Sequence, residues 1–81
     1  MNVNEIQRNI ETSLSVGDSF DKIEQFMKKN NMMYDFDYHE SRFQARMSAG
    51  QQDTDNIAIH IYVDIDGRFV RAHVERVYTY L

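Results

Sequence analysis

Two histidines are placed where they could act together. His60 and His73 lie at equal distances from the dipeptide Asp66-Gly67, which is typical of a two-residue turn between antiparallel strands. A hairpin centred on that turn puts the two imidazoles directly opposite each other, within reach of one cation or, when both are protonated, in a repulsive pair. Zinc sites in proteins need more than two ligands, and no third is evident in the sequence. We therefore predict no metal at this pair, with a cation shared by the two imidazoles as the alternative.

Acidic spacings elsewhere in the chain imitate sites without completing them. Asp64-Ile-Asp66-Gly67 and Asp53-Thr-Asp55-Asn56 begin like calcium-binding loops, but neither continues to the later glycine and terminal glutamate of an EF-hand. Asp35 and Asp37 share one strand face, where acidic side chains discourage pairing with a second sheet. There is no cysteine, no glycine-rich phosphate loop and no Gly-x-Ser-x-Gly. We therefore predict a protein without enzymatic activity and without a cofactor.

The element that positions the histidines is a hairpin with two different faces. One face is almost wholly aliphatic, because the turn pairs Ile57, Ile59, Ile61, Val63 and Ile65 with Arg76, Val74, Ala72, Val70 and Arg68, respectively. The other face combines charges and aromatic rings, and its pairs are Asp64 with Phe69, Tyr62 with Arg71, His60 with His73, and Ala58 with Glu75. We expect the aliphatic face to be buried and the other to be exposed.

Two further strands and two helices precede the hairpin. Apolar and polar residues alternate over 34–38 and over 42–49, which predicts strands joined near Glu40-Ser41. The predicted cross-strand pairs are Tyr38 with Phe43, Phe36 with Ala45, Tyr34 with Met47, and Asp35 with Arg46. Apolar residues recur every three or four positions over 3–14 and over 20–27, which predicts two amphipathic helices.

The order of these elements predicts the fold. Gly17 suits the connection between the helices, and Asp18 or Ser19 is the expected cap of the second helix. Strands that are apolar on one face only need a cover on that face, which the helices supply. The expected fold class is α+β, in the order α-α-β-β-β-β, with two N-terminal helices packed on one face of a four-stranded antiparallel meander.

The composition is that of one folded domain spanning residues 1–81. Hydrophobic residues make up 42% and charged residues 27% of the chain, which is ordinary for a globular protein. The net charge of −4 argues against broad attraction to nucleic acid or to an anionic membrane. No apolar run is long enough to span a membrane, and residues 1–8 are too polar for a secretory signal. We expect a cytoplasmic protein, or a periplasmic or lipid-anchored one if a leader has been removed.

The segment 14–27 (Leu-Ser-Val-Gly-Asp-Ser-Phe-Asp-Lys-Ile-Glu-Gln-Phe-Met) opens the second helix behind a short first one. With Gly17, the Ser19 cap, Ile23 and the element order, it resembles the fold shared by the β-lactamase-inhibitor protein repeat and the BamE/SmpA-type lipoproteins. The chain departs from the lipoproteins in having no lipid-acceptor cysteine and no proline after the second helix. The resemblance implies a protein-binding scaffold without catalysis, which offers its target the sheet face that the helices leave uncovered.

That uncovered face is basic and aromatic on an acidic protein. We predict that it binds a partner through Arg42, Gln44, Arg46, His60, Tyr62, Phe69, Arg71 and His73. Arginine and tyrosine dominate interface hot spots, because planar donors and rigid rings gain much contact and lose little entropy. The expected function is a small non-catalytic binding module, an inhibitor or immunity-type protein that occludes a protein partner with an acidic surface. A solvated face with weak cross-strand pairs is the structural alternative.

Two other partners stay open. A homodimer could form through the same face or through residues 77–81, which are predicted to lie beyond the paired strands unless a β-bulge near Glu75-Arg76 returns them to the core. Single-stranded RNA could stack its bases on the aromatic rings of the face and bind its phosphates to the arginines, through Tyr62, Phe69, Arg42, Arg46 and Arg71. The net charge of −4 disfavours nucleic acid, and no membrane partner is expected.

Overall fold

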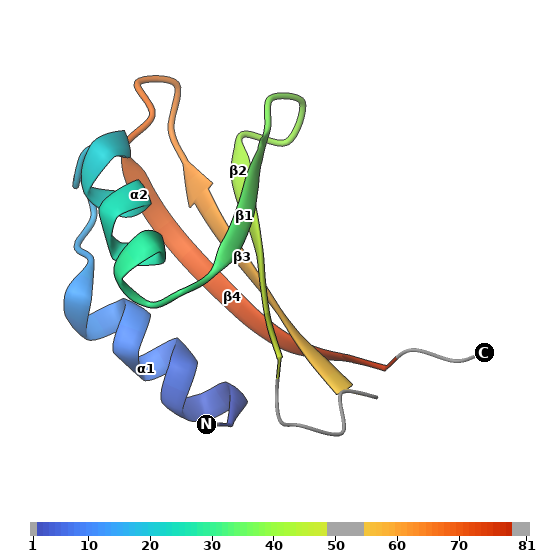
Figure 1. Cartoon of the computed structure of the whole chain (residues 1–81). Coiled ribbons are helices and arrows are strands. Elements are labelled where there is room, and N and C mark those ends of the chain that lie inside the picture. The colour runs from blue at the N-terminus through green and yellow to red at the C-terminus, as the bar shows by residue number, and fades with distance from the viewer. Residues whose placement is uncertain (1, 49–54, 79–81) are drawn as a thin grey trace.

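Two helices precede four strands along the chain, and the strands form one antiparallel sheet (Figure 1). The computed structural model describes residues 2–48 and 55–78. The elements are α1 (Val3–Ser13), α2 (Phe20–Lys29), β1 (Met33–Asp37), β2 (Arg42–Ser48), β3 (Asp55–Val63) and β4 (Phe69–Tyr78). Each strand lies beside the next one in sequence, in the order β1-β2-β3-β4. The α+β meander predicted from the sequence is confirmed.

Both helices begin at a polar side chain that accepts a backbone hydrogen bond. Asn2 Oδ1 accepts from the N–H of Glu5 at 2.9 Å, and Ser19 Oγ accepts from the N–H of Lys22 at 3.1 Å. Each cap satisfies a donor that the first helical turn leaves unpaired. Gly17 turns the chain between the helices with a φ of 95°, a left-handed value that favours glycine. Neither helix in the described part of the chain is long and apolar enough to cross a membrane.

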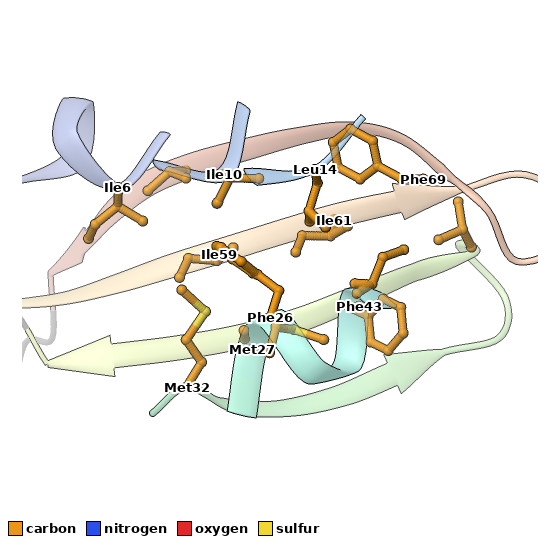
Figure 2. Packing of buried hydrophobic residues seen from close by; sticks show 14 of the residues in the cluster. Ile6, Ile10, Leu14, Phe26, Met27, Met32, Phe43, Ile59, Ile61 and Phe69 are labelled. Carbon is orange, nitrogen blue, oxygen red and sulfur yellow. The ribbon is translucent and has the colours of Figure 1, made fainter. Parts of the chain in front are cut away.

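The apolar stripes of both helices pack on one face of the sheet (Figure 2). Ile59 and Ile61 of β3 lie on this covered face of the sheet and are fully buried. The helical side chains buried in the same cluster are Ile6, Ile10, Ile23, Phe26 and Met27. Burial of one such side chain contributes about 1.5–3 kcal/mol. In a chain without cysteines, no disulfide assists this apolar cluster in holding the helices on the sheet.

The predicted register holds through the middle of β3 and β4. His60 lies opposite His73, and Tyr62 lies opposite Arg71. The isoleucines of β3 set this register, because a slip of one residue would move the whole aliphatic row to the uncovered face.

The turn between β3 and β4 is longer than the predicted two-residue turn. Residues 64–68 form a loop in which the Asp64 N–H donates to the Arg68 carbonyl and the Gly67 N–H donates to the Asp64 carbonyl, both at 2.9 Å. Asp64 Oδ1 accepts two more backbone hydrogen bonds, from the N–H groups of Asp66 and Arg68. A carboxylate that satisfies the donors of its own loop favours this loop over the tighter turn.

The longer loop changes the face on which Phe69 lies. Val63 pairs with Phe69, and the register shift leaves Val70 as the extra residue of a β-bulge. Phe69 is only 5% exposed and belongs to the buried cluster, as Figure 2 shows. Its N–H donates to the Asp18 carbonyl, and its own carbonyl accepts from the Gly17 N–H. The prediction that Phe69 lies on the uncovered face is therefore wrong, as is the predicted pairing next to the turn, because these bonds and the buried ring outweigh the tight turn.

β1 and β2 also pair in a register that differs from the predicted one. Phe36, rather than Tyr38, lies opposite Phe43. Asp37 Oδ1 accepts from the N–H groups of the two residues that follow Tyr38, and Ser41 takes a left-handed φ of 53°, so the loop already begins after Asp37. The shift of two residues keeps the side chains of β1 on their predicted faces and gives them different partners, whereas Tyr38 lies beyond the strand and is exposed.

The outer edge of β4 is closed by a side chain of α1. Gln7 Nε2 donates to the Ala72 carbonyl at 3.0 Å, and Gln7 Oε1 accepts from the Val74 N–H at 2.9 Å. The amide of Gln7 thus takes the hydrogen-bonding place of a further strand, which protects an edge that other chains could otherwise join.

The last strand stays paired as far as its last described residue. Val77 lies opposite Asn56 and Tyr78 lies opposite Asp55, so the overhang predicted to begin at Val77 is wrong. The pairing is regular at Glu75, where the sequence allowed a bulge. Residues 49–54 and 79–81 lie outside the described residues.

Candidate functional site

Polar and aromatic side chains gather on the sheet face that points away from the helices. β2, β3 and β4 contribute alternate residues, while the residues between them on each strand point into the core. The residues that define this open sheet face are Arg42, Gln44, Arg46, His60, Tyr62, Arg71 and His73. They are the residues predicted from the sequence, except Phe69, which is buried on the opposite side of the sheet.

An aromatic ring between two arginines forms one row across the open sheet face. Arg42, Tyr62 and Arg71 are direct neighbours on β2, β3 and β4. Arg71 Cζ lies 3.9 Å from the centre of the Tyr62 ring, and Arg42 Cζ lies 5.9 Å from it. Arg42 Nη1 also donates to Tyr62 Oη at 3.4 Å. A guanidinium that stacks on a ring uses its flat face, so its orientation is restricted while the N–H donors at its edge stay available for a partner. The row therefore presents an ordered cationic surface.

His60 occupies the next row, and both of its ring nitrogens are engaged. Nδ1 lies 3.3 Å from Arg42 Nη1, and Nε2 lies 2.8 Å from Glu75 Oε2. A guanidinium only donates, so Nδ1 must accept, and the ring proton sits on Nε2 and is donated to Glu75. His60 therefore links the arginine row to a carboxylate at the side of the face.

The two histidines face each other as the hairpin predicted. The rings of His60 and His73 are stacked, with centroids 6.2 Å apart and an angle of 16° between their planes. While His60 keeps its bonds to Arg42 and Glu75, it has no lone pair to share with a cation. Within residues 2–48 and 55–78, no group of three potential ligands is arranged to hold a metal ion.

The three arginines of the open sheet face differ in how far their side chains are buried and in the bonds that they make. Arg42 is half-buried, and its Nε is buried without a hydrogen-bond partner. Arg46 and Arg71 are exposed, and the guanidinium of Arg46 makes no hydrogen bond or ion pair with another described residue. The exposed pair has the N–H donors that a carboxylate-bearing partner would use.

A shallow groove of about 430 Å³ lies beside Arg46, at the β1 side of the face. Its lining residues are Met33, Tyr34, Asp35, Gln44 and Arg46. Asp35 lies opposite Gln44 instead of the predicted Arg46, and Gln44 Nε2 donates to Asp37 Oδ2 at 3.0 Å. Met33 is exposed, and it was not predicted as part of the site. The signal in the sequence was its position next to Tyr34, because neighbouring residues of a strand point to opposite faces of the sheet.

Basic and acidic side chains are mixed on the face. Arg42 and Arg46 lie on β2, and Arg71 lies on the outer strand β4 together with Glu75, while Asp35 and Asp37 lie on the outer strand β1. On a chain with a net charge of −4, the three arginines give this face a local cationic surface.

Comparisons of the chain with known protein families, with curated proteins and with solved structures found no match. The resemblance to inhibitor and lipoprotein folds therefore rests on the segment 14–27 and on the order of the elements. The functional assignment depends on the geometry of the open sheet face.

Proposed function

We propose that this chain is a small non-catalytic protein-binding module, of the inhibitor or immunity type, which covers an acidic surface of its partner with the open sheet face. The observation that carries the proposal is the stack of Arg71 on Tyr62 at 3.9 Å, with Arg42 in the same row. Guanidinium groups bind carboxylates through paired hydrogen bonds, and arginine and tyrosine contribute most at interface hot spots. An acidic protein surface is the partner that this row fits best.

The order of the face before binding supports this function. Tyr62 is held by its two arginine neighbours, and His60 is held between Arg42 and Glu75. Side chains that are already ordered lose less entropy when a partner arrives. A rigid platform of this kind blocks its target by covering it, with little rearrangement of its own backbone.

Affinity capture from a cell lysate tests the proposal with three immobilised proteins. These are the wild type, the face variant Arg46→Glu/Arg71→Glu, and the control variant Arg8→Glu/Lys29→Glu. The control replaces two exposed cations on α1 and α2 and changes the net charge by the same amount. Thermal unfolding first establishes that all three proteins are folded.

We expect one protein to be captured by the wild type and by the control variant and to be absent from the face variant. Equal capture by all three proteins, or equal loss from both variants, would remove the open sheet face from consideration. A dimer in light scattering that only the face variant disrupts, with no second protein captured, would replace the proposal with a homodimer. Captured RNA whose binding weakens steeply with salt would replace it with RNA binding.

A further inference from the structure

A second surface lies where the two hairpin loops and the start of α2 meet, at one end of the sheet (Figure 1). Between them is a cleft of about 410 Å³, which we call the tip cleft. Its apolar walls and floor come from Phe20, Phe36, Tyr38, Val63, Ile65 and Gly67. None of these residues belongs to the open sheet face.

Aromatic rings form the walls of the tip cleft. Phe36 lies edge-on to Phe20, with centroids 5.2 Å apart, and to Tyr38, with centroids 4.9 Å apart. Gly67 brings the β3–β4 loop against this wall, since a Cβ at its position would lie 3.3 Å from Phe20 Cδ2. Its φ of 77° also favours glycine, so this close approach depends on the absence of a side chain.

Two large side chains stand on the rim of the cleft without being buried. Ile65 is 99% exposed and Tyr38 is 84% exposed. A single exposed apolar residue is common on protein surfaces and needs no explanation. Ile65 and Tyr38 line the same aromatic cleft, and exposed apolar residues gathered around a cleft mark interaction sites.

The loop that presents Ile65 is held by hydrogen bonds at its base. Arg68 Nη1 donates to the Gly17 carbonyl at 2.8 Å, and the backbone of Phe69 bonds to Gly17 and Asp18. With the internal bonds of the loop, these contacts fix the backbone that carries Ile65 before any partner binds. An apolar side chain that extends from a fixed backbone and is exposed among the described residues is suited to anchoring a ligand.

The rim of the tip cleft is acidic. Asp64 and Asp66 are both exposed, and the Asp66 carboxylate makes no hydrogen bond or ion pair with the described residues. The nearby guanidinium of Arg68 is bonded to the Gly17 carbonyl instead. An apolar cleft with a negative rim complements an apolar group flanked by cations.

We infer that the tip cleft binds a basic peptide segment, which inserts an aliphatic or aromatic side chain flanked by lysine or arginine. The inference does not depend on the function proposed for the open sheet face. The two surfaces share no residue, and they favour partners of opposite charge.

Fluorescence anisotropy with dye-labelled hexapeptides tests this inference. The probes carry a central leucine or phenylalanine flanked by lysines, and the matched probes carry a central serine or flanking glutamates. The variants are Ile65→Ser and Asp66→Lys, and the control is Val16→Ser, which changes an apolar side chain that is 78% exposed outside the cleft. NMR of the Ile65 methyl groups and of the backbone amides reports where the peptide binds.

We expect the lysine-flanked apolar peptides to shift the Ile65 methyl resonances and to bind at least about tenfold more tightly than either matched probe. Ile65→Ser and Asp66→Lys should each weaken binding about tenfold, and Val16→Ser should leave it unchanged. The inference is overturned if no probe shifts Ile65, if glutamate-flanked probes bind equally well, or if the shifts fall on Tyr62 and Arg71. Shifts of Ile65 that depend only on protein concentration would assign the cleft to a second copy of the chain and would also overturn it.

Discussion

The open sheet face and the tip cleft lie on the same small domain, but different interactions organise them. Side chains order the open sheet face, where Arg71 covers Tyr62 and His60 is bonded at both ring nitrogens. Backbone hydrogen bonds and left-handed residues order the tip cleft, where Gly67 lets the loop contact Phe20. One surface is flat and cationic, and the other is apolar with an acidic rim.

This difference indicates how each surface responds to mutation. Exposed side chains of the open sheet face can be exchanged at little cost in stability, so binding and folding are separable there. The backbone of the tip cleft is tied to the connection between α1 and α2, so its glycine and loop residues serve folding as well. Ile65 is the exception, because its side chain contacts little of its own chain.

The largest effect should follow from a cavity in the buried apolar cluster between the helices and the sheet. We predict that Ile59→Ala lowers the free energy of unfolding by about 2–5 kcal/mol, because Ile59 is fully buried and a cavity would replace it. Denaturant unfolding measures the loss. Ile65→Ala is the matched control and should change stability by less than about 0.5 kcal/mol. Equal effects at the two positions would contradict the assignment of Ile59 to the buried cluster and of Ile65 to the exposed rim of the tip cleft.

The next effect concerns the edge of β4. We predict that Gln7→Ala lowers the free energy of unfolding by about 1–3 kcal/mol, because the Ala72 carbonyl and the Val74 N–H lose their partner. Hydrogen exchange of the Val74 amide should become faster, whereas the control Arg8→Ala, at an exposed position of the same helix, should leave it unchanged. An unchanged Val74 amide in Gln7→Ala would show that the edge is not closed in this way.

A pair of glycines sharpens the description of the tip cleft. Gly17 and Gly67 both have left-handed φ values, so alanine at either position should cost about 1–2 kcal/mol. Gly67→Ala should cost more than Gly17→Ala, because its Cβ would meet Phe20 while nothing lies within 4 Å at Gly17. Thermal and denaturant unfolding of the two variants measure the difference. Equal losses would mean that the close approach to Phe20 is not required.

The smallest effect is a dependence of stability on pH at the base of the tip. The N–H of Ser15, and then the ammonium group of Lys22, hold the pKa of Asp18 below its ordinary value. A carboxyl whose pKa is lower in the folded state stabilises the protein above its unfolded pKa, and this contribution is lost as the pH falls through the folded pKa. We predict that Asp18→Asn is less stable than the wild type at pH 7 and that the difference disappears in strong acid. A difference that stays constant down to pH 2 would contradict this assignment.

The middle of the open sheet face was predictable from the sequence because its register is set by neighbouring residues. Alternation of isoleucine with His60 and Tyr62 decides which side chains are buried, and the antiparallel partner follows from a single turn position. A loop of a different length could still keep this register, because the bulge at Val70 absorbs the change.

The tip cleft was not predictable in the same way, because contacts between distant segments build it. Phe69 turns toward the core only when its backbone meets Gly17 and Asp18, which the hairpin pattern does not contain. The bonds that Asp64 makes within its loop compete with the two-residue turn, and sequence pattern alone does not decide between them. Phe20 and Tyr38 come from different elements, so their meeting around one cleft required the structure.

The most direct test of the proposed function is the affinity of the captured partner, measured by isothermal titration calorimetry. We predict that Arg46→Glu/Arg71→Glu weakens binding about a hundredfold or more, because two exposed arginines at the centre of an interface each contribute about 1–2 kcal/mol. The control Arg8→Glu/Lys29→Glu should change the affinity less than about twofold, since rim or distant charges act weakly. Losses of equal size in both variants, or no loss in either, would contradict binding through the open sheet face.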